Sequence, residues 1–174
     1  ERGAPGGGGR RIERHKDVGA RDQGKLGGLL GGEPREDPRR PGGIRRLADA
    51  DGVDSAGKRA VVVGRAETVG RPTATLLSGR GPGGDATTTV CHSRTEDLAG
   101  ATRSAEILVV AAGPPECAAA GMLSAGVFVH ALGLHRVDAG AAAAGHVLGA
   151  VDFLNAPASA ACTPPSPAGA PPVT

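Results

Sequence analysis

Aromatic residues are almost missing from this chain: its 174 residues include no tryptophan, no tyrosine and two phenylalanines, Phe128 and Phe153. Proteins that hold single-stranded nucleic acid stack the bases on aromatic side chains, so the sequence offers no such platform. The one basic cluster, Arg39-Arg40 followed by Arg45-Arg46, is interpreted as a solvated face. We therefore predict no nucleic-acid partner.

Cysteine and long apolar runs are also scarce. The three cysteines, Cys91, Cys117 and Cys162, are odd in number and widely spaced, which suits neither a disulfide framework nor a zinc site. We expect free thiols, no metal and a reducing, cytoplasmic location. No apolar run is long enough to span a bilayer, and residues 1–11 contain no hydrophobic signal region. Membrane attachment and secretion are therefore not expected.

What the chain has in abundance is glycine, with 30 residues, and proline, with 14. The two ends of the chain are rich in glycine, proline or arginine, whereas the apolar residues gather between Ala60 and Phe153. We therefore expect order in the middle of the chain, a disordered segment over residues 1–14 and an irregular tail over residues 156–174. The Ala- and Gly-rich residues 139–145 fit either a helix or a linker.

The middle of the chain alternates between strand and helix patterns. Apolar, β-branched runs predict four strands, over residues 59–63, 87–90, 107–111 and 126–132. Helices are expected over residues 44–50, 72–77 and 96–103, with a loop over residues 31–43. This order is typical of an α/β fold, a Rossmann-like parallel sheet with flanking helices.

The segment from Val61 to Pro72 carries the first chemical signal. A buried strand runs into Gly64, and a second glycine, Gly70, precedes a helix that opens near Pro72. Glycines allow close approach of a ligand, and the positive end of the helix suits a pyrophosphate. Arg65 and Arg71 add positive charge. The spacing is not that of the common dinucleotide fingerprint, so an ordinary strand-to-helix turn remains an alternative here.

The residues at the end of the next strand also favour nucleotide binding. In nucleotide-binding α/β sheets, this position lies beside the adenosine ribose, where an acidic residue suits NAD. Here the chain has Ser93, Arg94 and Thr95 with no immediate acid. Because an arginine fork pairs well with phosphate, this arrangement favours NADP over NAD. A surface arginine is the alternative for Arg94 taken alone.

Several ordered blocks resemble one family, the bifunctional methylenetetrahydrofolate dehydrogenase/methenyltetrahydrofolate cyclohydrolases. The first block, G-K-x-A-V-V-V-G-R followed by V-G-R-P, is similar to a family signature, and T-V-C-H-S-R-T is similar to its cofactor-specificity segment. The similar blocks occupy residues 57–65, 69–72, 89–95, 105–115, 122–137 and 149–153. Another NADP enzyme family, the shikimate dehydrogenases, fits the general sheet but not the two loops.

The resemblance implies two α/β domains, one binding folate and one binding NADP. It implies oxidation of methylenetetrahydrofolate with NADP and hydrolysis of the methenyl product, within one-carbon metabolism, by a homodimer. On this basis we expect a remnant of the folate domain in residues 1–43, an NADP-binding Rossmann-like domain in residues 44–155 and a C-terminal tail in residues 156–174. The cofactor-binding residues expected are Gly64, Arg65, Ala66, Gly70, Arg71, His92, Ser93, Arg94, Thr95, Gly113 and Thr174.

The chain departs from the family pattern at several positions. Ala66 stands where the family has serine, and Arg39-Arg40 stands where it has Cys-Thr. The family's Tyr-x-x-x-Lys motif, which carries its catalytic lysine, has no match in the chain. The catalytic residues are therefore unknown. A non-catalytic NADP-binding fragment and a decayed relic of the enzyme remain alternatives to an active dehydrogenase/cyclohydrolase.

Overall fold

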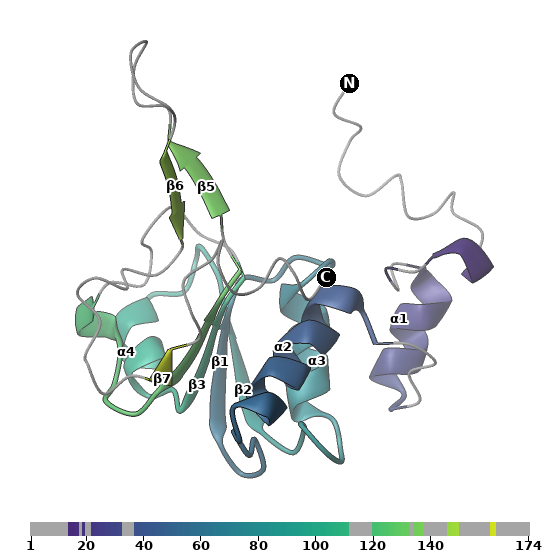
Figure 1. Cartoon of the computed structure of the whole chain (residues 1–174), viewed down its shortest axis with the longest axis horizontal. Helices are drawn as coiled ribbons and strands as arrows, with labels where there is room; N and C mark the ends of the chain where they lie inside the picture. Colours follow the sequence, from purple (N-terminus) through teal and green to yellow (C-terminus); the bar gives the residue numbers. More distant parts are fainter. Residues whose placement is uncertain are drawn as a thin grey trace.

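A five-stranded parallel sheet forms the centre of the molecule (Figure 1). The computed structural model describes residues 14–17, 19, 22–32, 37–111, 120–132, 134–137, 146–149 and 161–162. The strands are β1 (Arg59–Val63), β2 (Thr87–Cys91), β3 (Ile107–Val110), β4 (Phe128–Ala131), β5 (Leu134–Val137), β6 (His146–Gly149) and β7 (Ala161–Cys162). The helices are η2 (Arg14–Lys16), α1 (Gln23–Leu30), α2 (Arg39–Ala50), α3 (Gly70–Ser78), α4 (Leu98–Arg103) and η3 (Ala120–Met122).

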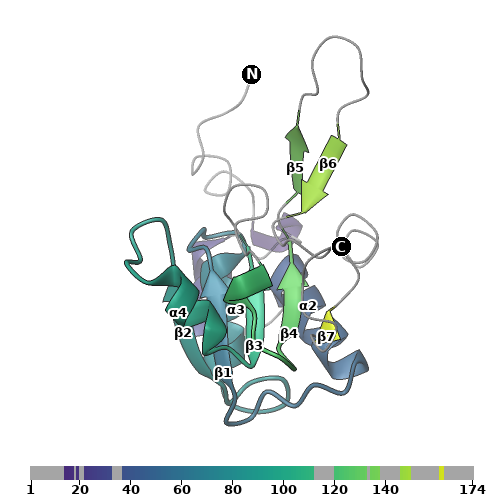
Figure 2. The same ribbon diagram turned by 90° about the vertical axis from the view of Figure 1, so that its left-hand side faces the viewer.

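The strand order across the sheet is β2-β1-β3-β4-β7, which Figure 2 shows from the side. All four pairings are parallel, with Val61 opposite both Thr89 and Leu108. A parallel order that starts in the middle and grows outward on both sides is that of a nucleotide-binding Rossmann-like sheet. The predicted fold class is therefore confirmed.

Successive residues of each strand face opposite sides of the sheet and build two cores. Val61 and Val63 belong to a cluster that packs against Leu98 and Ala101 of α4. Ala60 and Val62 belong to the other cluster, which is covered by α2 and α3. Because both faces are covered, β3 and the last four residues of β1 are apolar and buried, as a sheet buried on both faces requires.

Helix α2 begins earlier in the chain than the sequence predicts. The loop predicted over residues 31–43 is wrong for its last residues, because α2 begins at Arg39 and continues to Ala50. Pro41 is tolerated in the first turn, where its missing N–H has no partner to lose. Gly42 and Gly43 are buried, and a Cβ on Gly42 would lie 2.9 Å from the Cβ of Asp37. The glycines thus allow close packing at the start of the helix.

Three strands had no counterpart among the predicted elements. β5 and β6 pair in antiparallel fashion, and both ribbon views show this hairpin projecting from the body of the molecule. β7 lies within the segment predicted as an irregular tail, and it pairs with β4. The predicted helix over residues 44–50 begins five residues earlier, at Arg39, whereas the remaining predicted strands and helices are found within two residues of their expected bounds. The leucines of residues 26–30 lie on α1. Residues 139–145 and almost all of residues 1–14 lie outside the described part of the chain.

Candidate functional site

Two loops follow β1 and β2 at the carboxyl edge of the sheet. They lie side by side, because the N–H of Gly64 donates to the carbonyl of Cys91 over 2.8 Å. Nine of the residues expected to bind the cofactor belong to these loops or to the first turn of α3 (Gly70–Ser78), and they are brought together at this edge. They are Gly64, Arg65, Ala66, Gly70, Arg71, His92, Ser93, Arg94 and Thr95. The other two, Gly113 and Thr174, lie outside the described residues.

The first loop needs glycine at both of its predicted positions. Gly64 has a φ of 119°, a conformation that residues with a side chain rarely adopt. A Cβ on Gly70 would lie 2.1 Å from the carbonyl oxygen of Gly64, so the loop folds back tightly on itself. The N–H of Arg71 donates to the carbonyl of Ala66 over 3.1 Å and closes the turn.

The amino-terminal end of α3 faces this loop without a capping side chain. Its N-cap residue, Val69, makes no side-chain cap hydrogen bond, and the first turn contains no acidic residue. The partial positive charge of the helix end is therefore not neutralised from within the helix. An anion placed beside residues 65–70 gains both this charge and backbone N–H donors.

The second loop is ordered by hydrogen bonds of its own. The N–H of His92 donates to the hydroxyl of Thr95 over 2.9 Å, and the N–H of Arg94 donates to Nδ1 of His92 over 3.2 Å. Because Nδ1 accepts this hydrogen bond, a neutral His92 ring carries its proton on Nε2. Ser93 and Arg94 are left exposed at the tip of the loop, where they can reach a ligand.

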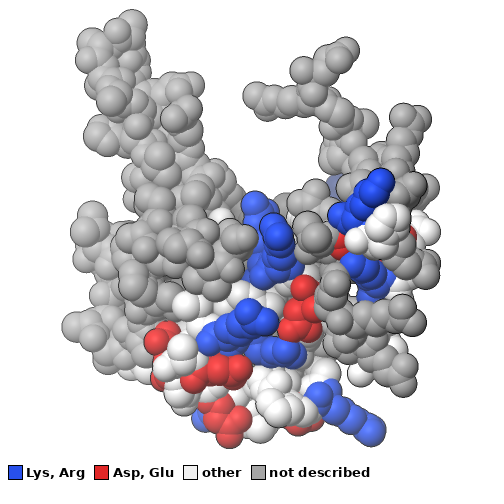
Figure 3. All heavy atoms as spheres, turned by 45° about the vertical axis from the view of Figure 1, so that its right-hand side comes forward, with Lys and Arg blue, Asp and Glu red and all other residues white. Residues whose placement is uncertain are grey.

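Arginines give the edge a positive character. Arg65 and Arg94 are exposed and form no ion pair with any described residue. Arg71 pairs weakly with Glu67, at 3.8 Å, with about two thirds of each side chain exposed. Elsewhere on the face shown in Figure 3, basic and acidic side chains are interspersed. The carboxyl edge is thus suited to an anionic ligand with more than one phosphate group.

Cys91 lies beneath the second loop and takes no part in this chemistry. Burial raises the pKa of the Cys91 thiol above its ordinary value, and a hydrogen bond with Thr95 offsets this effect in part. A thiol with a raised pKa stays protonated near neutral pH, so it is a poor nucleophile. Cys91 is free, as expected, whereas Cys117 and the side chain of Cys162 lie outside the described part of the chain.

Glu67 is the site residue that the sequence-based prediction missed. Its spacing of four residues from Arg71 is the available signal, because side chains at that distance meet on a helical turn.

Within the described ranges, no group of three His, Cys, Asp or Glu side chains is placed to hold a metal ion. No described helix is long and apolar enough to cross a membrane.

Comparison with known proteins agrees with this geometry. The model of the tetrahydrofolate dehydrogenase/cyclohydrolase NAD(P)-binding domain matches residues 38–174. The chain is 46% identical over 164 residues to "Bifunctional protein FolD 2" of Haloarcula marismortui, covering 94% of this chain and 55% of that protein. A Frankia alni protein with the same printed name is 42% identical over 164 residues, covering 94% of this chain and 54% of its own length. The chain thus spans about half the length of the curated relatives it matches.

Solved structures show the same fold. The bifunctional FolD enzyme of Campylobacter jejuni superposes with a TM-score of 0.84 at 34% identity, covering 94% of this chain and 55% of that one. The Trypanosoma brucei enzyme, solved with NADP cofactor and an inhibitor, gives a TM-score of 0.83 at 34% identity, covering 93% and 55%. The sheet order, the two loops and these matches agree, and the chain belongs to the tetrahydrofolate dehydrogenase/cyclohydrolase family through its NAD(P)-binding domain.

Proposed function

We propose that this chain binds NADP at the carboxyl edge of β1 and β2. The observation that carries the proposal is the convergence of Arg65, Arg71 and Arg94 on one edge of the sheet, next to an uncapped helix end. The residues fit the cofactor, because the first loop offers N–H groups and positive charge where a pyrophosphate is held. The exposed Arg94 suits the 2′-phosphate that distinguishes NADP from NAD.

The proposed reaction is that of the family: oxidation of methylenetetrahydrofolate with NADP, and hydrolysis of the methenyl product, in one-carbon metabolism. NADP, when bound, supplies the hydride acceptor. The chain's own residues hold and orient it: the glycine turn lets the backbone approach the phosphates, and the His92–Thr95 hydrogen bond presets the second loop. No described residue is assigned the role of catalytic acid, base or nucleophile.

We also propose a domain arrangement, partners and a location for the chain. We place the folate-domain remnant in residues 1–43, the NADP-binding domain in residues 44–155 and the tail in residues 156–174. We propose tetrahydrofolate derivatives and a second copy of the chain as partners, and no nucleic acid. A cytoplasmic location is proposed because Cys91 is a free thiol, as expected in a reducing compartment.

Titration calorimetry with NADP, and with NAD as the comparison, tests the proposal. We expect NADP to bind about tenfold or more tightly than NAD, because one charge-assisted contact to the 2′-phosphate is worth that much. Absence of binding by a chain that circular dichroism shows to be folded would refute the proposal. Turnover of methylenetetrahydrofolate by the binding-competent chain then separates an enzyme from a non-catalytic binding module.

A further inference from the structure

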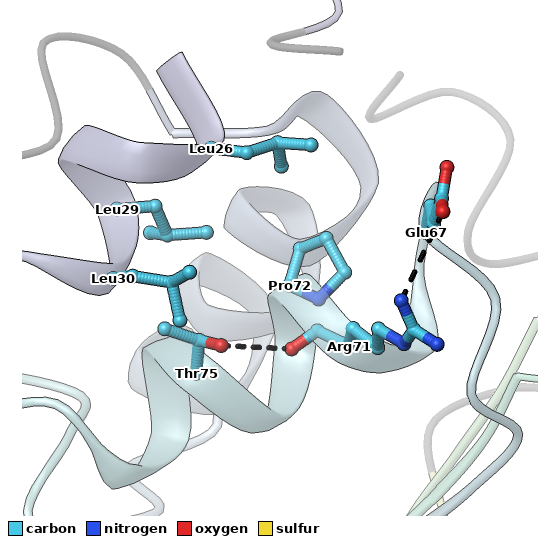
Figure 4. Close-up of a pocket in the computed structure, with 7 residues that line it drawn as sticks. All are labelled: Leu26, Leu29, Leu30, Glu67, Arg71, Pro72 and Thr75. Carbon is cyan, nitrogen blue, oxygen red and sulfur yellow. Dashed lines mark hydrogen bonds and ion pairs between the residues drawn. The ribbon is translucent and has the colours of Figure 1, made fainter. Parts of the chain in front are cut away.

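A pocket with a volume of about 190 Å³ lies between α1 and the first turns of α3 (Figure 4). Leu26, Leu29 and Leu30 point from α1 toward Pro72 of α3 and form its apolar part. The opposite end is formed by Glu67 and Arg71. The pocket thus has one apolar and one charged end, and it shares Arg71 with the proposed nucleotide site.

The apolar end of the pocket leaves hydrophobic surface in water. Leu29 is buried, but Leu30 is 75% exposed, the most exposed large hydrophobic residue of the described chain. Leaving such a side chain in water is unfavourable, and a ligand that covers it gains the free energy of burial. An apolar group in contact with Leu30 is therefore the first requirement for an occupant.

The charged end favours an anion. Glu67 and Arg71 are 3.8 Å apart, too far for a hydrogen bond, and both side chains are about two thirds exposed. The guanidinium of Arg71 is thus free to exchange its partner. The uncapped amino-terminal end of α3 adds its partial positive charge to that of Arg71, so together they exceed the negative charge of the single carboxylate of Glu67.

We infer that this pocket binds a small aromatic monocarboxylate, with its ring against Leu30 and Pro72 and its carboxylate on Arg71. The volume is that of about six water molecules, which fits one ring with a short acidic substituent. Because Arg71 also belongs to the proposed pyrophosphate loop, an occupant that holds Arg71 weakens binding of the nucleotide. This coupling between the occupant and the nucleotide rests on the proposed function, whereas the pocket itself does not.

Benzoate is the probe for the first test, with amide chemical shifts of the isotope-labelled chain as the measurement. We expect a Kd of about 1 mM, as befits a ligand of this size, with shifts centred on Leu26, Leu30 and Thr75. Benzamide, which has the same shape without the charge, is expected to bind more weakly. Stronger binding of benzylamine than of benzoate would overturn the charge assignment, and shifts centred elsewhere would overturn the site.

Two exposed hydrophobic residues provide a matched pair of variants. Leu30→Ser removes the apolar wall and is expected to weaken benzoate about tenfold. Val90→Ser removes the other large hydrophobic side chain that is exposed among the described residues, on β2 and outside the pocket, and is expected to leave benzoate binding unchanged. Because both side chains are exposed, neither variant is expected to unfold the chain. Equal losses in the two variants would contradict the inference.

The coupling is tested by titrating NADP with and without saturating benzoate. We expect the Kd of NADP to rise about fivefold, and by reciprocity NADP must weaken benzoate by the same factor. An unchanged Kd would refute the shared use of Arg71. If the chain does not bind NADP at all, the proposed function fails, whereas the benzoate titration and the Leu30→Ser variant still decide the pocket.

Discussion

A Cβ atom on Gly70 would lie 2.1 Å from the carbonyl oxygen of Gly64, so these two glycines fix the shape of the phosphate-facing loop together. The contact is between a position at the start of α3 and backbone at the end of β1, neither of which can move without disturbing the sheet or the helix. Any side chain at position 70 must therefore open the loop and displace the N–H groups beside it.

Gly70→Ala is expected to destabilise the chain by about 1–3 kcal/mol, since its methyl group meets rigid backbone. It is also expected to abolish nucleotide binding. Gly27→Ala is the matched control, because Gly27 also lies in a helix but a Cβ there would have no neighbour within 4 Å. That variant is expected to gain about 0.5–1 kcal/mol. Urea unfolding of both variants measures the difference, and similar stabilities would contradict the tight turn.

Arg94→Ala is expected to weaken NADP about tenfold to a hundredfold while leaving NAD unchanged, because the lost contact is to the 2′-phosphate alone. Arg94 is exposed and forms no ion pair with another described residue, so its removal is not expected to alter stability. Calorimetric titration with both nucleotides provides the measurement. An equal loss for NAD would place Arg94 on the pyrophosphate instead.

Glu67→Gln is expected to tighten NADP about twofold to fivefold. The carboxylate of Glu67 lies beside the loop that receives the phosphates and competes for Arg71. The gain should shrink as salt concentration rises, because both side chains are exposed and their interaction is screened. Asp49→Asn, an exposed acid on α2, has the same change of charge and controls for the net charge of the chain. Equal gains in both variants would remove any local role for Glu67.

The imidazole of His130 makes the stability of the fold depend on pH. His130 is 1% exposed on β4, and its Nδ1 has no hydrogen-bond partner among the described residues. Burial lowers the pKa of His130 below its ordinary value of 6.5, although the negative charge of Asp51 acts in the opposite direction. The unfolded chain therefore takes up the proton first. Stability is full above about pH 6.5 and falls as the pH drops below that value.

His130→Leu tests this account through thermal unfolding at a series of pH values. The variant is expected to be about 1 kcal/mol more stable at pH 7, because it removes an unpaired buried nitrogen, and to lose the decline that begins near pH 6.5. A decline below pH 4.5 should persist, since the hydrogen bond from the Arg59 N–H lowers the pKa of Glu106 from that value. Persistence of the higher-pH decline would rule out His130 as its source.

The central strands of the sheet could be predicted from the sequence because they are short, apolar and buried on both faces. Val61, Val62 and Val63 show this pattern without any knowledge of their neighbours. Other features depend on partners distant in the chain. The pairing of β7 with β4 joins residues more than thirty positions apart, and the helical fit of Gly42 and Gly43 depends on Asp37 and the core. A loop is expected over residues 31–43 because glycine and proline disfavour helices. Tertiary packing outweighs that local preference at the start of α2.

The candidate site likewise has features that the sequence predicts and features that it does not. Its two loops could be placed from the sequence, because glycines and arginines at the ends of parallel strands meet at one edge. The hydrogen bond from Arg94 to Nδ1 of His92 and the pocket beside Arg71 could not, since both depend on how the loop and α1 pack.

The edge position of β2 leaves the loop after it freer to change in sequence than the loop after β1. Among the described strands, β2 is the outermost and pairs with β1 alone, and Ser93 and Arg94 in the loop that follows it are exposed. Substitutions at Ser93 and Arg94 leave every core contact intact. The preference for one nucleotide over another can thus drift or be selected at these two positions, while the glycine turn after β1 is held constant by the fold itself.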